Sequence, residues 1–132
     1  MIVLDASALV DVLLERGAPG DWVARRLLEA DSVHAPHLID IEVASVLRRR
    51  AAGGAISPRR GREALEDLAS IPLTRYPATP LLERIWELRS NLTAYDANYV
   101  ALAEALAAPL VTMDARLGSA PGHRTQVDVF PG

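Results

Sequence analysis

The sequence predicts an α/β protein with a central, mainly parallel sheet of about four or five strands, covered by helices on both faces. Short apolar segments alternate with longer segments of helical periodicity along the whole chain. Two of the apolar segments end at an aspartate, Asp5 in "IVLDASALV" and Asp114 in "LVTMDARL". The chain has 132 residues and no internal repeat or long linker, so we expect a single domain over residues 1–132.

The first half of the chain predicts two strands and four helices. The apolar run at 2–4 gives the first strand, and Ser57-Pro58 is typical of a helix start because Ser caps the helix and Pro fits its first position. The segment "GAPG" is expected to separate two of the helices, and Gly53-Gly54 to end a third. The predicted strands lie at 2–4 and 32–36, and the helices at 6–16, 21–30, 37–52 and 58–69.

The second half predicts three strands and two helices. The strand within "IPLTRYP" contains Pro72, which favours an edge position because Pro cannot donate to a neighbouring strand. A helix at 79–90 is followed by an Ala-rich helix at 94–107, for which Thr93 is the expected cap. "PLVTM" predicts a buried strand and "QVDVF" a weak last one.

The composition excludes several kinds of chemistry. Cysteine is absent, so the chain has no disulfide, thiolate metal site or thiol nucleophile. All 14 basic residues are Arg, which excludes Schiff-base chemistry and phosphate-binding loops that need Lys. The N-terminus lacks a basic region, and no stretch of about 18 apolar residues occurs. We therefore expect a cytoplasmic protein without a signal peptide or membrane span.

The charge is unevenly distributed. The net charge is −3, yet residues 43–62 hold six Arg and no acid. These six are Arg48, Arg49, Arg50, Arg59, Arg60 and Arg62. Arg binds phosphate through two parallel hydrogen bonds, so this Arg patch is a candidate contact for RNA or for a protein partner. The alternative is a solvated helix end, where cations are also favoured.

Each acidic residue of interest has a structural explanation. Asp5 could cap the helix that follows the first strand, and Asp114 could cap the turn at "ARLG". Asp96 lies three residues after Thr93, which is the spacing of a capping box. Glu42 could be a solvated helix residue.

Their positions favour a shared site. If the strands that precede Asp5 and Asp114 are neighbours, their ends lie about 5 Å apart. Glu42 and Asp96 border apolar helix faces that could pack over that edge of the sheet. Four carboxylates that converge there would repel one another, and a divalent cation would offset this repulsion. Oxygen ligands without His or Cys are typical of Mg²⁺ or Mn²⁺, and such sites usually carry out phosphoryl chemistry.

Four segments, "IVLDASALVDVLL", "HLIDIEVASVLRR", "YDANYVALAEAL" and "LVTMDARL", together resemble a PIN-domain ribonuclease of the VapC toxin type. The resemblance spans nearly the whole chain and implies a three-layer α/β/α fold. It places the acidic quartet of the family, catalytic and metal-binding, on Asp5, Glu42, Asp96 and Asp114. It implies a Mg²⁺- or Mn²⁺-dependent endoribonuclease that uses a metal-activated water on RNA, with tRNA or another structured RNA as the expected substrate. It also implies a homodimer and a VapB-like antitoxin that blocks the site.

Further residues are expected to assist this site. Ser7 matches the hydroxyl residue that commonly follows the first Asp of the family and assists the metal. Asn98 is a candidate contact for substrate or water, and Arg116 could reach a phosphate or form a surface ion pair. Asp40 lies about 200° around the helix from Glu42, so we expect it to point elsewhere. Tyr99 is expected in the core or at a dimer contact.

Other functions remain open from the sequence. One is a PIN-fold module that only binds a partner, and another is a PIN nuclease with a housekeeping role in RNA processing. A phosphatase that starts from a strand-end Asp is disfavoured, because it needs a second acid at the position of Ser7 and a Lys.

Overall fold

The computed structural model of the protein describes residues 1–132. Its centre is a five-stranded sheet in the order β3-β2-β1-β4-β5, and every neighbouring pair is parallel. The predicted parallel sheet is therefore confirmed, with all strands parallel. The strands are β1 (Ile2–Leu4), β2 (Val33–Pro36), β3 (Thr74–Tyr76), β4 (Leu110–Thr112) and β5 (Val127–Val129).

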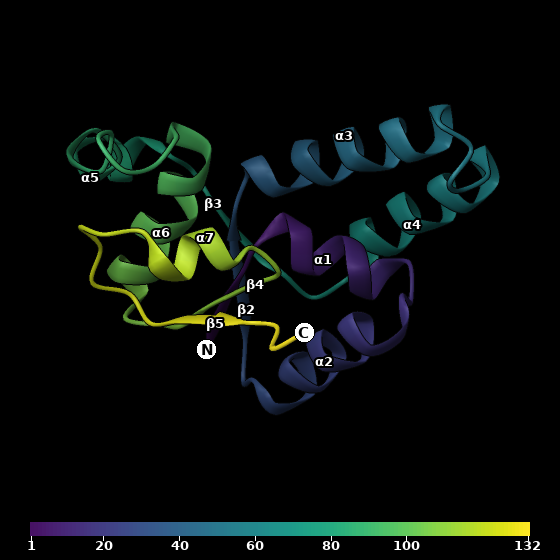
Figure 1. Ribbon diagram of the computed structural model, residues 1–132, viewed down its shortest axis with the longest axis horizontal. Helices are drawn as coiled ribbons and strands as arrows, with labels where there is room; N and C mark the ends of the chain where they lie inside the picture. The colour runs from purple at the N-terminus through teal and green to yellow at the C-terminus, as the bar shows by residue number, and fades with distance from the viewer.

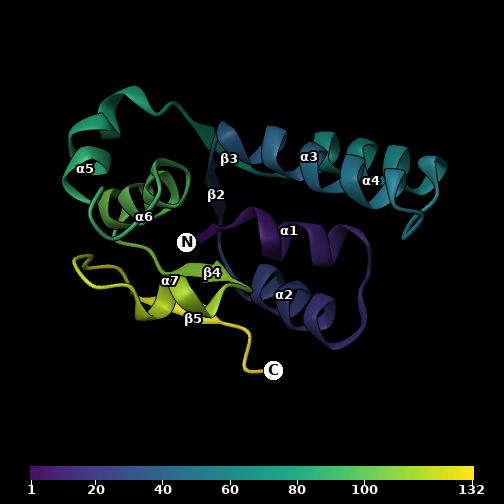
Figure 2. The same ribbon diagram turned by 45° about the horizontal axis from the view of Figure 1, so that its top comes forward.

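Helices cover both faces of the sheet and complete three layers. Figure 1 shows α1 to α4 on one side and α5 and α6 on the other, with the α3–α4 pair extending away from the sheet. Figure 2 shows the same division after rotation. None of these helices has the length and apolar character required to cross a bilayer. The helices are α1 (Ala6–Leu13), α2 (Gly17–Glu29), α3 (Leu38–Ala52), α4 (Pro58–Ser70), α5 (Leu82–Glu87), α6 (Ala94–Leu106) and α7 (Ala115–Ser119), with a short 3-10 helix, η1 (Thr79–Leu81), before α5.

Two predicted helix starts are confirmed by their caps. The Ser57 side chain accepts a hydrogen bond from the Arg60 N–H at 3.0 Å, and Pro58 follows at the first helical position. Thr93 accepts from the Asp96 N–H at 3.2 Å and starts α6. Each cap satisfies an N–H that has no partner within the helix. The predicted edge position of the strand after Pro72 is also confirmed, since β3 ends the sheet.

Two predicted segments differ from the structure, and one short helix was missed. The segment "GAPG" forms the first turn of α2 instead of a loop, because Pro19 suits a first turn and Gly20 packs against α1. A Cβ at Gly20 would lie 2.8 Å from the Asp11 carbonyl oxygen. The helix predicted at 79–90 is a 3-10 turn followed by the six-residue α5. The short helix α7 was not predicted.

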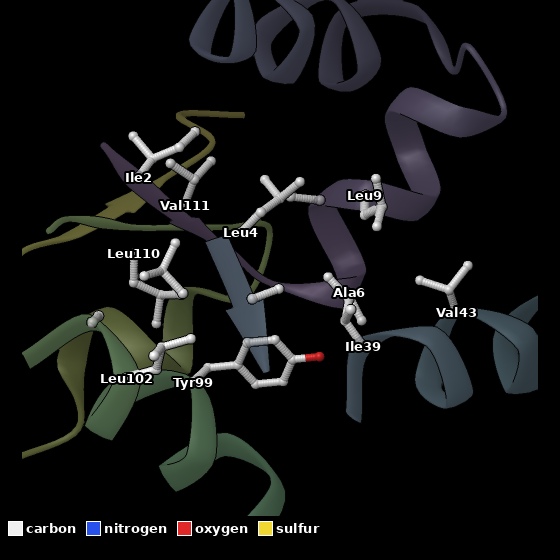
Figure 3. Close-up of a cluster of buried hydrophobic side chains, with 14 of the residues drawn as sticks. Ile2, Leu4, Ala6, Leu9, Ile39, Val43, Tyr99, Leu102, Leu110 and Val111 are labelled. Carbon is white, nitrogen blue, oxygen red and sulfur yellow. The ribbon is translucent and has the colours of Figure 1, made fainter. Parts of the chain in front are cut away.

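The buried core lies around β1 and β4, the inner strands of the sheet. All three residues of each strand are buried, as expected for parallel strands covered on both faces. Figure 3 shows residues from β1 and β4 packed with Tyr99 of α6 and Ile39 of α3. The two strands pair with Leu4 beside Val111, so their carboxyl ends emerge side by side. This register brings Asp5 next to the residues that follow β4.

Candidate active site

Asp5 leaves the sheet directly after β1 and is 8% exposed. Its backbone N–H donates to the Val111 carbonyl at 3.0 Å, which fixes it against β4. Its Oδ2 accepts from the Ser7 hydroxyl at 2.9 Å and the Thr112 hydroxyl at 2.5 Å. It makes no side-chain cap for α1, so the capping role is wrong. Burial raises the pKa of Asp5, and the two hydroxyl hydrogen bonds only partly offset this.

Glu42 extends from α3 and is half-buried. The Tyr99 hydroxyl, from α6, donates to Glu42 Oε1 at 2.6 Å. In Figure 3 the Tyr99 ring crosses the core from α6 toward Ile39 on α3. Burial, then the charges of Asp5 and Asp96, raise the pKa of Glu42, while the Tyr99 hydrogen bond lowers it. Glu42 is thus held in the site and is not a solvated helix residue.

Asp96 lies in the first turn of α6. Its N–H donates to the Thr93 hydroxyl and completes one half of a capping box, so the structural role expected for Asp96 is present. Burial is the largest cause that raises the pKa of Asp96, followed by the charges of Asp5 and Asp114. Asp96 is therefore near both strand-end aspartates.

Asp114 differs from the other three acids. Its Oδ1 accepts from the Arg116 backbone N–H at 2.9 Å and caps α7. The Arg116 guanidinium also binds both carboxylate oxygens, at 3.0 and 2.7 Å. These hydrogen bonds lower the pKa of Asp114. The cap and the surface ion pair expected as alternatives are both present.

The four carboxylates are electrostatically coupled but do not share one coordination sphere. Burial raises the pKa of Asp5, Glu42 and Asp96, and the charges of neighbouring acids raise the pKa of Glu42 and Asp96 further. No group of three or more acidic or His side chains is arranged so that it could hold a metal ion. The electrostatic coupling of the acids is a stronger indication of a shared metal site than their present side-chain positions, since side-chain rotamers commonly change on binding. An oxygen-only donor set with excess negative charge fits a hard divalent cation.

Two hydroxyls join Asp5 to the segment after β4. Ser7 accepts from the Met113 N–H at 3.1 Å, and Thr112 accepts from the Asp114 N–H at 2.9 Å. Thr112 is fully buried and was not predicted as a site residue. The sequence does contain a signal for Thr112. In an extended segment side chains alternate between two sides, so Thr112 and Asp114, two residues apart, point to the same side.

Asn98 does not extend the cluster by any hydrogen bond. It is 7% exposed, and its Oδ1 is buried without a partner. Asp40 points away from the site, as expected, and forms an ion pair with Arg75 at 2.8 Å.

The Arg patch divides into two parts. On α4, Arg59 and Arg60 pair with Glu63 at 3.3 and 3.7 Å, and Arg60 also donates to the Leu13 carbonyl. On α3, none of the three Arg residues pairs with a carboxylate. The structure thus leaves Arg48, Arg49 and Arg50 free to bind a phosphate.

A three-layer α/β/α fold with acidic side chains after two central strands agrees with the similarity to known proteins. Residues 2–122 match the PIN domain family. The chain is 48% identical over 131 residues to Ribonuclease VapC9 of Mycobacterium tuberculosis, with 99% of each chain covered. It is 49% identical over 121 residues to Ribonuclease VapC1 of the same organism, covering 91% of this chain and 90% of VapC1. The chain therefore belongs to the PIN domain family, in its VapC branch.

A solved structure supports the same fold. The VapBC2 structure from Rickettsia felis, bound to a DNA fragment from its promoter, matches with a TM-score of 0.71 and covers 98% of each chain. Its identity to this chain is 14%, so the likeness concerns the fold.

Proposed function

We propose that this protein is a Mg²⁺- or Mn²⁺-dependent endoribonuclease of the VapC toxin type. The observation that carries the proposal is the cluster of Asp5, Glu42 and Asp96, whose pKa values are all raised at the carboxyl edge of the sheet. Ligands bind at this edge in parallel α/β sheets. The names of its relatives, which are ribonucleases, point to RNA as the substrate.

The proposed metal ligands are Asp5, Glu42, Asp96 and Asp114. A bound divalent cation lowers the pKa of water and offsets the negative charge on a phosphate. Asp5 is held in place by two hydroxyl groups, because Ser7 and Thr112 both donate to its Oδ2. Tyr99 holds Glu42 in a similar way. These hydrogen bonds fix two carboxylates before the substrate arrives, which reduces the cost of ordering the site.

Arg116 is exposed beside Asp114 and can exchange that carboxylate for an RNA phosphate. The guanidinium binds both groups with the same two-pronged geometry. In this proposal Arg116 releases Asp114 when metal and RNA bind. Asn98 is not assigned a chemical step, since its side chain makes no hydrogen bond to the cluster.

The expected partner is a VapB-like antitoxin that covers the carboxylates, and the expected assembly is a homodimer. The VapBC2 neighbour is a complex of this kind by its name. Co-expression with a VapB-like antitoxin, followed by sedimentation, would measure both the complex and the dimer. A protein that stays monomeric and unbound would contradict this part of the proposal.

The decisive experiment is incubation of the purified protein with total bacterial RNA, with Mg²⁺, with Mn²⁺ and with a chelator. Asp5→Asn is the matched variant, because it removes a ligand charge and keeps the side-chain shape. We expect discrete fragments that require both metal and Asp5. Fragments that persist with chelator or with Asp5→Asn would overturn the site.

A second measurement separates a nuclease from a binding module. Mg²⁺ should raise the melting temperature of the wild type and should raise that of Asp5→Asn less, since a ligand that binds only the folded state stabilises it. Metal stabilisation without cleavage of any RNA would favour a non-catalytic module. Cleavage confined to precursor RNAs would favour a housekeeping role.

A further inference from the structure

We propose that a hollow between α1 and α3 binds the RNA backbone phosphate next to the one that is cut, through Arg49 and Arg50. This subsite deepens the proposed ribonuclease function and depends on it. The hollow has a volume of about 320 Å³. Its lining residues are Ser7, Val10, Asp11, Val46, Arg49, Arg50 and Met113.

The hollow begins directly beside the carboxylates. Ser7 forms part of its wall and at the same time donates to Asp5 Oδ2 at 2.9 Å. Met113, another wall residue, donates its N–H to Ser7. An RNA molecule that places one phosphate at Asp5 therefore reaches the hollow with its next nucleotide.

One face of α3 supplies the positive charge. Val46, Arg49 and Arg50 are spaced three and four residues apart, so their side chains project from the same side of the helix. Apolar walls from Val10, Val46 and Met113 suit a sugar or base, while the two guanidinium groups suit a phosphate. This combination fits a nucleotide better than it fits a free anion.

The two Arg residues are not committed elsewhere. Arg49 donates to the Ser45 hydroxyl at 3.1 Å and pairs with no carboxylate. Nη1 of Arg50 is buried without any hydrogen-bond partner, although buried polar groups are nearly always paired. Asp11 is the single acid of the hollow and lies 4.0 Å from Arg16. A phosphate in the hollow would supply the acceptor that Arg50 lacks once the guanidinium turns toward it.

A second hollow extends the same basic surface. It has a volume of about 250 Å³ and shares Arg50 with the first. Arg16 and Arg60 also line it. An RNA strand that leaves the carboxylates thus meets Arg49 and Arg50 first and then Arg16 and Arg60.

The test measures binding of a labelled random-sequence RNA by fluorescence anisotropy over a range of salt concentrations. In this assay every protein variant also carries Asp5→Asn, so that the labelled RNA is not cut. Arg49→Gln and Arg50→Gln are compared with Arg25→Gln, which removes the same charge from an exposed position of α2 outside both hollows. A thermal melt of each variant reports folding, and exposed Arg49 gives a result even if Arg50→Gln is unstable.

Each Arg49 and Arg50 substitution should weaken RNA binding about tenfold, the loss typical of one charged hydrogen-bonding partner. Each should also reduce the slope of log binding constant against log salt concentration by about 0.7, the value expected for one phosphate contact on single-stranded RNA. Arg25→Gln should change neither quantity. Equal affinities for all three variants would overturn the subsite, and cleavage of total RNA by the wild type would show that the nuclease function stands without it. An unchanged RNA affinity with weakened binding of an acidic antitoxin peptide would likewise overturn it and assign the hollow to the protein partner.

Discussion

Thr112 Oγ1 donates a 2.5 Å hydrogen bond to Asp5 Oδ2, although the two residues lie 107 positions apart in the chain. The pairing of β1 with β4 makes this contact possible, since Leu4 lies beside Val111. Thr112 also accepts from the Asp114 N–H. One buried hydroxyl therefore connects the acids that follow the two central strands.

Replacing Thr112 with Val should destabilise the fold by about 1–3 kcal/mol, because it leaves the buried Asp5 carboxylate and the Asp114 N–H each short of a partner. RNA cleavage should also fall, since Asp5 loses one of the two donors to its Oδ2. Chemical denaturation and RNA cleavage assays measure the two effects. Thr112→Ser is the control, because it keeps the hydroxyl. A Val variant as stable and active as wild type would show that this hydrogen bond has no role.

Tyr99→Phe removes the hydroxyl that donates to Glu42 and keeps the aromatic ring. The hydrogen bond holds the pKa of Glu42 down against burial, so its loss should raise that pKa further. The acid limb of the pH–cleavage profile should then move to higher pH. The cost to stability should be about 1.5–3 kcal/mol, as for hydrogen bonds to charged groups.

Tyr95→Phe is the matched control for this prediction. Tyr95 lies on the same helix but is 61% exposed, so the Tyr95→Phe substitution should change neither stability nor the pH profile. If both Phe variants shift the profile equally, the effect does not come from Glu42.

The strands, the helix caps at Ser57 and Thr93, and the parallel arrangement could be predicted because they depend on local patterns of apolar, capping and turn residues. Convergence of Asp5, Glu42 and Asp96 was inferred from their positions at strand ends and helix borders. The hydrogen bonds of Thr112 to Asp5 and of Tyr99 to Glu42 could not be predicted. Their partners are distant in sequence, so only the tertiary structure identifies them, through the reach of Tyr99 from α6 to Glu42 on α3 and the pairing of β1 with β4.

The ion pair of Arg116 with Asp114 was expected only as an alternative, and its consequence for metal binding needs the geometry. Arg116 holds both Asp114 oxygens, so its positive charge competes with a cation for that carboxylate. Arg116→Gln should therefore tighten Mg²⁺ binding, measured by calorimetry on the RNA-free protein. It should also return the pKa of Asp114 toward its ordinary value.

Arg25→Gln controls for the change in net charge, because Arg25 is exposed on α2 and remote from Asp114 in sequence. Weaker Mg²⁺ binding in Arg116→Gln than in Arg25→Gln would contradict the competition. Cleavage at saturating Mg²⁺ gives the second readout, and a loss there would mean that Arg116 also binds the RNA phosphate.

The acid cluster should make the fold more stable in mild acid than at neutral pH when no divalent metal is present. The pKa values of Asp5, Glu42 and Asp96 are raised in the folded protein, so it binds protons more tightly than the unfolded chain does. This stabilisation is complete below the unfolded pKa values, 3.8 for Asp and 4.5 for Glu, and is lost as the pH rises through the folded values.

Asp114 and Glu104 act in the opposite direction, because Arg partners lower their pKa values. Their stabilisation is present above the unfolded pKa and is lost as the pH falls through the folded one. The free energy of unfolding in chelator should therefore rise as the pH falls from neutral through the raised pKa values of Asp5, Glu42 and Asp96, and decline in stronger acid. Asp5→Asn should be more stable than wild type at neutral pH and should flatten the rise. Denaturant unfolding at a series of pH values measures this. A wild type whose stability falls steadily below neutral pH would show that the pKa values of Asp5, Glu42 and Asp96 are not raised in the folded protein.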